Sequence, residues 1–285
     1  MPDAPPLRER LALHHWTLET TPLADFLRVA REAGWNAVEL RRSSFTKCFD
    51  AGMTNAQVVE LIRASGIKVA VLGTEYGLYF AKGDEQRRLF RVLEETCANA
   101  VALGCDLIMC AEGQPGGTIR NAAVNLRAAA EVCAAHHVRF AFEFSSAATV
   151  VNSLNAAREV HAAANHPNCG LLLDAYHMER TGSGGRGFED VPAQHIFAFQ
   201  YSDVPNTPRP ADNRRPADRL PPGRGVVRWG EVLGLLLEKN YTGYISYEAP
   251  NPAHWSRPAL DVAREGADAT RAVLAAIKPP AARGG

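Results

Sequence analysis

Four side chains with oxygen donors lie near the ends of the last four apolar segments of the sequence, where buried strands would end. They are Glu143 in AFEFS, Asp174 in LLLDAY, Gln200 in AFQYSD and Glu248 in SYEAP. Burying a carboxylate there costs free energy unless a partner compensates its charge. At equivalent depths on neighbouring strands, three carboxylates would repel one another unless a cation lay among them. Because hard ions prefer oxygen ligands, the sequence predicts one divalent ion, Mn²⁺ or Mg²⁺, with Co²⁺ and Zn²⁺ as alternatives.

The elements that must position these groups alternate along the whole chain. Short apolar segments predict strands at 11–17, 36–41, 68–76, 106–112, 139–145, 169–177, 195–203 and 243–250. Amphipathic segments predict helices at 22–34, 84–104, 121–137, 229–240 and 258–278, with at most a short helix in FEDVPAQ, 188–194, after the sixth strand. Eight strand–helix units predict an α/β fold, a (β/α)₈ TIM barrel, in a single domain over residues 1–285. A doubly wound sheet is the alternative, but the GxGxxG turn that it would need is absent.

The residues two positions before the four donors support a shared inward face. Alternate side chains of a strand lie on the same face of the sheet. The residues two positions before the donors have mostly small side chains, which leave space inside a barrel: Ala141, Leu172, Ala198 and Ser246. Catalytic groups of such barrels converge at the carboxyl ends of the strands. We therefore expect the four donors to meet at that end.

Two segments fall outside the strand–helix pattern. Residues 204–228 are rich in proline and arginine, and a loop of this length in a compact domain is usually a lid or a binding loop. From about residue 279 the sequence predicts a flexible C-terminal tail.

Composition excludes several classes of partner. Lys plus Arg and Asp plus Glu number 31 each, without the basic excess that is usual in nucleic-acid-binding proteins. No apolar run approaches the roughly 20 residues of a membrane span, and the N-terminus lacks the apolar core of a signal peptide. The six cysteines show no zinc-binding spacing, which indicates reduced core thiols. We expect a cytoplasmic protein that binds a small molecule, and leave assembly into a homo-oligomer open.

Several segments carry a resemblance to a known family. They are VELR, FEFS, LLLDAYH, QYSD, RLPPGRG and GYISYE, which together span most of the chain. The sequence resembles the xylose-isomerase-like barrel superfamily of sugar phosphate isomerases and epimerases. That superfamily includes inosose-processing enzymes, ketose 3-epimerases and 3-dehydroshikimate dehydratases. The resemblance implies a divalent metal held by one residue from each of strands five to eight, here Glu143, Asp174, Gln200 and Glu248.

The resemblance also implies two substrate contacts and contains one departure. His177 of the D-x-x-H run and Arg219 of the loop after strand seven match residues that contact substrate in the family. The family's strand-seven ligand is commonly His in an HxKD run, whereas this chain has Gln200 in QYSD. Glutamine at this place resembles the dehydroshikimate dehydratase branch and some uncharacterised relatives.

Such a site is suited to proton abstraction next to a carbonyl of a polyhydroxylated keto substrate. The metal would polarise the carbonyl and stabilise the developing enediolate, and Glu143 and Glu248 would act as base and acid. Isomerisation or epimerisation is the first expectation. Dehydration, with His177 as general acid, is the alternative, because it shares the same first step. Two alternative functions belong to other classes of protein: a non-catalytic barrel subunit and a three-zinc DNA-repair endonuclease. The endonuclease would have more histidines at the strand ends.

Three further residues near predicted strand ends are candidate substrate contacts: His14, Glu39 and Glu112. Either His14 or its neighbour His15 should face the barrel interior by alternation, and the sequence does not decide which. Glu39 could instead pair with Arg41. Trp16, Tyr76, Phe80 and Trp255 could form an apolar wall of the pocket or simply pack.

Overall fold

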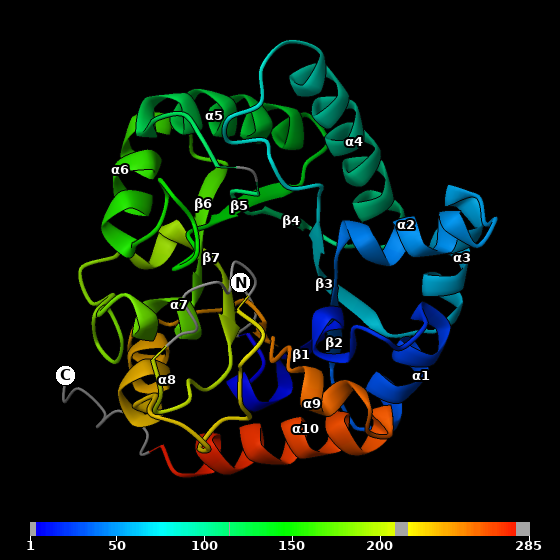
Figure 1. Ribbon diagram of the computed structural model, residues 1–285, viewed down its shortest axis with the longest axis vertical. Helices are drawn as coiled ribbons and strands as arrows, with labels where there is room; N and C mark the ends of the chain where they lie inside the picture. The colour runs from blue at the N-terminus through cyan, green and yellow to red at the C-terminus, as the bar shows by residue number, and fades with distance from the viewer. Residues whose placement is uncertain (1–3, 114, 209–215, 278–285) are drawn as a thin grey trace.

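The computed structural model describes residues 4–113, 115–208 and 216–277. Its eight strands close into one parallel barrel in the order β1 to β8. The strands are β1 Leu11–His14, β2 Ala37–Leu40, β3 Lys68–Gly73, β4 Leu107–Cys110, β5 Arg139–Glu143, β6 Cys169–Asp174, β7 Ile196–Tyr201 and β8 Ile245–Tyr247. Helices form an outer ring around the strands (Figure 1). The predicted (β/α)₈ fold is therefore confirmed, and the open doubly wound sheet is excluded.

The helices are more numerous than the sequence pattern predicted. The five predicted segments form α1 Leu23–Glu32, α4 Gly83–Ala102, α5 Ile119–Ala135, α8 Trp229–Glu238 and α10 Ala259–Ala275. Five others were not predicted: α2 Arg42–Asp50, α3 Asn55–Ala64, α6 Leu154–Ala164, α7 Ala175–Arg180 and α9 Pro252–Trp255. The signal for α6 was present, because Ser153 caps it and its apolar residues follow helical spacing.

The strands are shorter than predicted because polar side chains start new elements where they end. β6 ends at Asp174, whose carboxylate caps α7 by accepting a hydrogen bond from the Tyr176 backbone N–H at 2.8 Å. β1 ends at His14, and a 3₁₀ helix, His15–Leu18, follows directly. The residues that end these strands therefore also begin the loops that line the barrel mouth.

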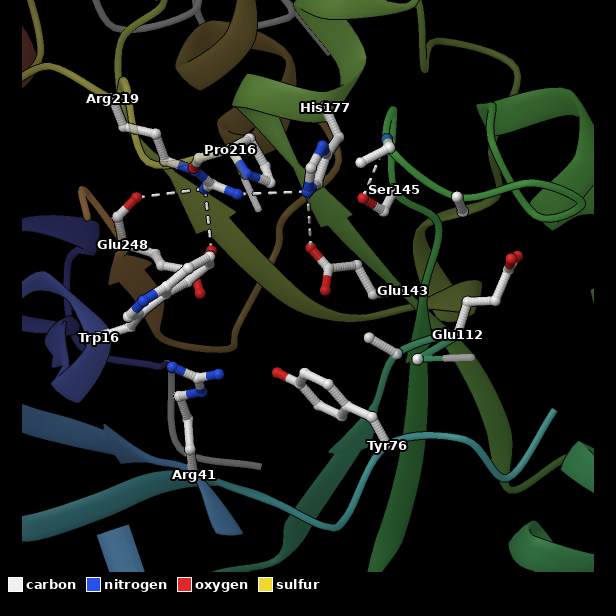
Figure 2. A pocket seen from close by; sticks show the side chains of 14 residues that line it. Trp16, Arg41, Tyr76, Glu112, Glu143, Ser145, His177, Pro216, Arg219 and Glu248 are labelled. Atoms are coloured by element: carbon white, nitrogen blue, oxygen red, sulfur yellow. Dashed lines mark hydrogen bonds and ion pairs between the residues drawn. The ribbon is translucent and has the colours of Figure 1, made fainter. Parts of the chain in front are cut away.

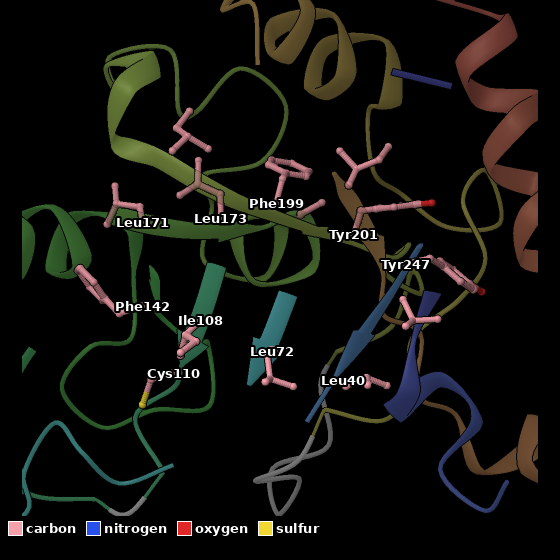
Figure 3. Close-up of a cluster of buried hydrophobic side chains, with 14 of the residues drawn as sticks. Leu40, Leu72, Ile108, Cys110, Phe142, Leu171, Leu173, Phe199, Tyr201 and Tyr247 are labelled. Carbon is pink, nitrogen blue, oxygen red and sulfur yellow. The ribbon is translucent and has the colours of Figure 1, made fainter. Parts of the chain in front are cut away.

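Side-chain alternation divides the core into two layers. Outward-facing residues such as Leu72, Phe142 and Phe199 form the larger cluster, between the strands and the helices (Figure 3). The interior of the barrel holds a smaller cluster of mostly small residues: Ala12, Ala37, Ala70, Val71, Leu107, Met109, Ala141, Leu172 and Ala198. The expectation of small inward-facing residues beneath the donors is thus met on strands five to seven.

Strand register corrects one detail of the prediction. Asp174 lies level with Gln200, but Glu143 lies level with Leu172, and Gln200 with Ser246. Glu143 is therefore two residues away from the level of Asp174, and Glu248 is two residues away from the level of Gln200. The four donors do not all lie at the same depth in the barrel. The displacement is the stagger that closing a sheet into a barrel requires, and alternation still leaves all four side chains inward.

Other predictions concern the cysteines and the termini. All six cysteines are free, and five of them are buried, as expected for reduced core thiols. Within the described part of the chain, no helix is long and apolar enough to cross a membrane. The predicted tail from about residue 279 and residues 209–215 of the predicted loop lie outside the described residues.

Candidate active site at the carboxyl end of the barrel

A cavity of about 370 Å³ opens at the carboxyl ends of the strands (Figure 2). The described residues that line it are Trp16, Arg41, Tyr76, Ala111, Glu112, Gly113, Glu143, Ser145, Ala147, Ala148, His177, Pro216, Arg219 and Glu248. They come from the segments that follow nearly all the strands and from the long loop after β7. Five of the predicted site residues are among them: Glu112, Glu143, His177, Arg219 and Glu248.

Glu143, Asp174 and His177 form a compact group of potential ligand atoms. One ligand atom from each lies within 4.8 Å of the others, and all three residues are buried. His177 Nε2 is 3.6 Å from Glu143 Oε1 and 3.7 Å from Asp174 Oδ2. The sequence assigned His177 to substrate and proton transfer, whereas the structure also places it among the groups that could hold a metal.

Arg219 carries the long loop's positive charge into the centre of this group. Its Nη1 lies 2.7 Å from Asp174 Oδ2 and 2.9 Å from Glu248 Oε2, and its Nη2 is 3.2 Å from His177 Nε2. The guanidinium also stacks on the ring of Tyr176, with its carbon 4.4 Å from the ring centroid. Arg219 thus joins the ends of β6 and β8 and is 1% exposed.

Burial and crowding disturb the acidity of the two cavity glutamates. Burial raises the pKa of Glu143 well above its ordinary value, and the charges of Glu248 and Asp174 raise it further, against the effect of Arg219. Burial also raises the pKa of Glu248, and Arg219 opposes this shift more strongly than any other charge. Carboxylates with raised pKa values are better matched to accepting and returning protons near neutral pH.

The residues present fit a divalent cation. Glu143 Oε1 and Gln200 Oε1 are buried and have no hydrogen-bond partner among the described residues. Buried acceptors without donors are costly, and mutual repulsion among Glu143, Asp174 and Glu248 adds to that cost. A cation would compensate both. The oxygen donors together with one imidazole form a set that divalent ions of intermediate hardness accept.

Three further predicted residues are fully buried and are not among the described residues that line the cavity: Gln200, Glu39 and His14. Gln200 Nε2 donates a 2.7 Å hydrogen bond to Glu39 Oε1. Burial raises the pKa of Glu39 to about 8, with the charges of Glu248 and Asp174 adding to the shift and the hydrogen bond from Gln200 opposing it. The charge of Glu39 is therefore suppressed at neutral pH.

His14, not His15, faces the barrel interior. His14 Nδ1 accepts a hydrogen bond from the Trp16 backbone N–H at 3.0 Å, which places the proton of the neutral ring on Nε2. That Nε2 lies 3.3 Å from Glu248 Oε1 but makes no hydrogen bond with any described residue. His15 instead bonds Ser44 and stacks on Phe26 outside the barrel.

Glu112 lines the cavity, but its carboxylate is engaged by the neighbouring loop. Its oxygens accept hydrogen bonds from the backbone N–H groups of Thr149 at 2.9 Å and Val151 at 2.7 Å, and from the Thr149 hydroxyl at 3.0 Å. The same loop contains Ser146, whose hydroxyl lies 3.0 Å from His177 Nδ1. Glu112 therefore orders the loop beside His177, and its predicted role as a substrate contact stays a prediction.

The sequence analysis did not select two residues that hold the site. The Tyr79 hydroxyl donates to the Glu143 backbone carbonyl at 2.7 Å and accepts from the Glu143 N–H at 3.1 Å. Asp203, the last residue of QYSD, is fully buried at the base of the long loop. An aspartate at the end of a predicted strand that carries a predicted ligand was a signal that could have selected it.

Asp203 anchors the loop that delivers Arg219. Its Oδ1 accepts hydrogen bonds from the N–H groups of Val204 and Val227, both at 2.9 Å. Its Oδ2 accepts from the Gly223 N–H at 2.7 Å and from Trp229 Nε1 at 2.9 Å. An isolated bridge to Leu220 places Asp203 beside the residue that follows Arg219. The carboxylate thus closes both ends of the loop onto the end of β7.

Asp203→Asn is expected to destabilise this loop and to weaken catalysis. The amide NH₂ would face two donors, and each buried donor left without an acceptor costs about 1–3 kcal/mol. Urea unfolding measures the loss of stability, and Asp190→Asn, at an exposed position, is the matched control. Unchanged unfolding of Asp203→Asn relative to Asp190→Asn would refute the anchoring role.

Comparisons with known proteins agree with this architecture. The family model described as "Xylose isomerase-like TIM barrel" matches residues 27–273. An inosose isomerase of Halalkalibacterium halodurans is 24% identical over 90% of this chain and 93% of that protein. A 3-dehydroshikimate dehydratase of Pseudomonas aeruginosa is 26% identical over 58% of this chain but only 26% of that protein.

Solved structures show the same fold at lower sequence identity. A crystal structure of the IOLI protein with a bound zinc atom superposes with a TM-score of 0.82 at 19% identity, over 94% of this chain and 99% of that one. The D-psicose 3-epimerase of Clostridium cellulolyticum, solved with D-tagatose, gives a TM-score of 0.75 at 15% identity, over 94% and 99% of the two chains. With the family model covering most of the barrel, the chain belongs to the xylose isomerase-like TIM barrel family.

Proposed function

We propose that the chain is a metal-dependent enzyme that removes a proton next to the carbonyl of a polyhydroxylated keto substrate, and that it acts as an isomerase or epimerase. The observation that carries this proposal is the pair Glu143 and Glu248. Both line one cavity, both are buried, and burial raises the pKa of both. Two such carboxylates can remove a proton and return one.

Glu143, Asp174, Gln200 and Glu248 would hold the metal, and His177 could join them. A bound divalent ion, with Mn²⁺ or Mg²⁺ proposed first and Co²⁺ or Zn²⁺ as alternatives, would polarise the substrate carbonyl. The protein supplies the rest of the chemistry. Arg219 holds Glu248 in place, and Tyr79 holds the backbone of Glu143. Arg219 also keeps a fixed positive charge at the point where negative charge develops.

Dehydration is the second candidate, and His177 is the observation that favours it. Its Nε2 lies 3.6 Å from Glu143 Oε1, so acid and base would act on adjacent substrate atoms. Loss of a hydroxyl requires a proton donor beside the base, and a histidine in contact with the base can provide one. Gln200, which resembles the dehydratase branch, adds to this alternative.

Turnover in deuterated water distinguishes the two outcomes. An isomerase or epimerase should transfer solvent deuterium to the carbon next to the carbonyl, because the proton on the base exchanges with solvent. A dehydratase should release water and form a conjugated product that absorbs in the ultraviolet. Mass spectrometry and absorbance across keto sugars, inososes and cyclic keto acids measure both. Binding of these compounds with neither change would instead support a non-catalytic barrel.

A further inference from the structure

Arg41 is a second arginine of the cavity, and none of the chemistry above uses it. It directly follows β2, and its side chain is 10% exposed. In the view of Figure 2, Arg41 and Tyr76 lie on the opposite side of the cavity from His177 and Arg219. Among the described lining residues, Arg41 and Arg219 are the two arginines, and there is no lysine.

The two arginines differ in how strongly their charges are compensated. Arg219 contacts two carboxylates at 2.7 and 2.9 Å and donates to the backbone carbonyls of Pro216 and Glu248, both at 3.2 Å. Arg41 has one direct carboxylate contact, to Glu19 at 3.4 Å, and Glu19 is also held by Lys47 at 3.0 Å; the charge of Glu248 acts on Arg41 from beyond contact distance. Arg41 therefore retains more of its capacity to bind an incoming anion.

Aromatic rings surround the Arg41 guanidinium. Its carbon lies 4.7 Å from the ring centroid of Trp16 and 5.9 Å from that of Tyr76. Both rings line the cavity, and Figure 2 shows the Tyr76 hydroxyl pointing toward the guanidinium. Stacking leaves the edge of a guanidinium free for hydrogen bonds, and partial exclusion of water strengthens its interaction with an anion.

We propose that Arg41, Trp16 and Tyr76 form a subsite for a carboxylate group attached to the ring of the substrate. The planar fork of a guanidinium matches a carboxylate with two parallel hydrogen bonds. The aromatic rings offer flat apolar surfaces to the adjoining carbon ring. A volume of about 370 Å³ is within the range of small-molecule sites. The substrate class is thus a hydroxylated cyclic keto acid, not a neutral keto sugar.

The charges of the cavity also orient such a substrate. Glu143 would repel a carboxylate at its own end, whereas Arg41 attracts it to the other; the charge of Glu248 acts on both Arg41 and Arg219. The carbonyl end then lies toward the two glutamates, where proton transfer is proposed. The inference rests on the proposed function only in assigning proton transfer to the two glutamates. It is compatible with epimerisation and with dehydration of a keto acid.

Binding of a matched pair of ligands tests the subsite without requiring turnover. Shikimate carries a ring carboxylate and three hydroxyls but no ketone, and its methyl ester lacks the charge. Calorimetry at one fixed ionic strength should find that shikimate binds the wild-type protein about 10–100-fold more tightly than the ester. Arg41→Gln should bring this ratio close to one, and Arg41→Lys should retain part of it.

Arg42→Gln is the matched control, because it removes the same charge one residue away. Arg42 pairs with Glu95 and does not belong to the described cavity lining, so its variant should keep the wild-type ratio. Thermal unfolding confirms that each variant is folded, and Arg41→Lys serves if Arg41→Gln is not. Equal binding of acid and ester, a ratio that survives Arg41→Gln, or no measurable binding of either ligand would overturn the subsite.

The outcomes separate this inference from the proposed function. Preference for the acid that depends on Arg41, without turnover of any keto substrate, would refute the proposed function and leave the subsite standing. Efficient turnover of neutral keto sugars, with no preference for the acid, would refute the subsite and leave the proposed function standing.

Discussion

Glu143→Gln and Glu248→Gln should each lower turnover by roughly 10²–10⁴-fold, because an amide keeps the shape of the side chain but cannot accept the proton. Their effects on stability should differ. Glu143→Gln removes a buried carboxylate that Glu248 and Asp174 repel, so its melting temperature should stay level or rise. Glu248→Gln deprives Arg219 of a carboxylate at 2.9 Å, so its melting temperature should fall.

Glu75→Gln is the matched control for both substitutions. Glu75 follows β3 near the same end of the barrel, but its carboxylate pairs with Arg88 at 3.0 Å, and it is not among the described residues lining the cavity. Its turnover should remain near that of the wild-type protein. Steady-state kinetics with the substrate found by the deuterium assay measure all three. Wild-type turnover in either cavity variant would remove that glutamate from the mechanism.

Removing the metal is expected to abolish turnover and to lower thermal stability. We expect one divalent ion per chain, since Glu143 Oε1 and Gln200 Oε1 are buried and have no hydrogen-bond donor among the described residues. An ion at 100 times its dissociation constant would stabilise the folded state by about 2.7 kcal/mol. Elemental analysis gives the stoichiometry, and melting curves before and after chelation give the stabilisation.

Variants of the proposed ligands test the metal site apart from activity. Asp174→Asn and Gln200→Ala should weaken metal binding and reduce the stabilisation, whereas Glu75→Gln should not. Absence of stoichiometric metal, together with full activity in chelator, would contradict metal dependence. Unchanged metal affinity in Gln200→Ala would mean that Gln200 serves only to bond Glu39.

Local sequence signals were sufficient for the fold and for the inward face of the site. The alternation of apolar strands with amphipathic helices predicted all eight strands of the barrel. The period of two along a strand placed Glu143, Asp174 and Gln200 on the inner face, because that period is a property of the strand itself. The strand ends were predicted too far along, since capping by Asp174 depends on a short helix that the pattern did not show.

Contacts between distant segments depended on the tertiary structure. Arg219 meets Asp174 only because Asp203 closes the loop after β7, and Arg41 meets Trp16 only because β1 and β2 lie side by side. The stagger of the barrel set the relative depths of Glu143 and Glu248. The amino-acid sequence by itself determined the barrel and the residues that face its interior, because both follow from local periodicity. Only the tertiary structure decided which charges pair and which arginine still faces the cavity with little compensation, because pairing depends on loop closure and register.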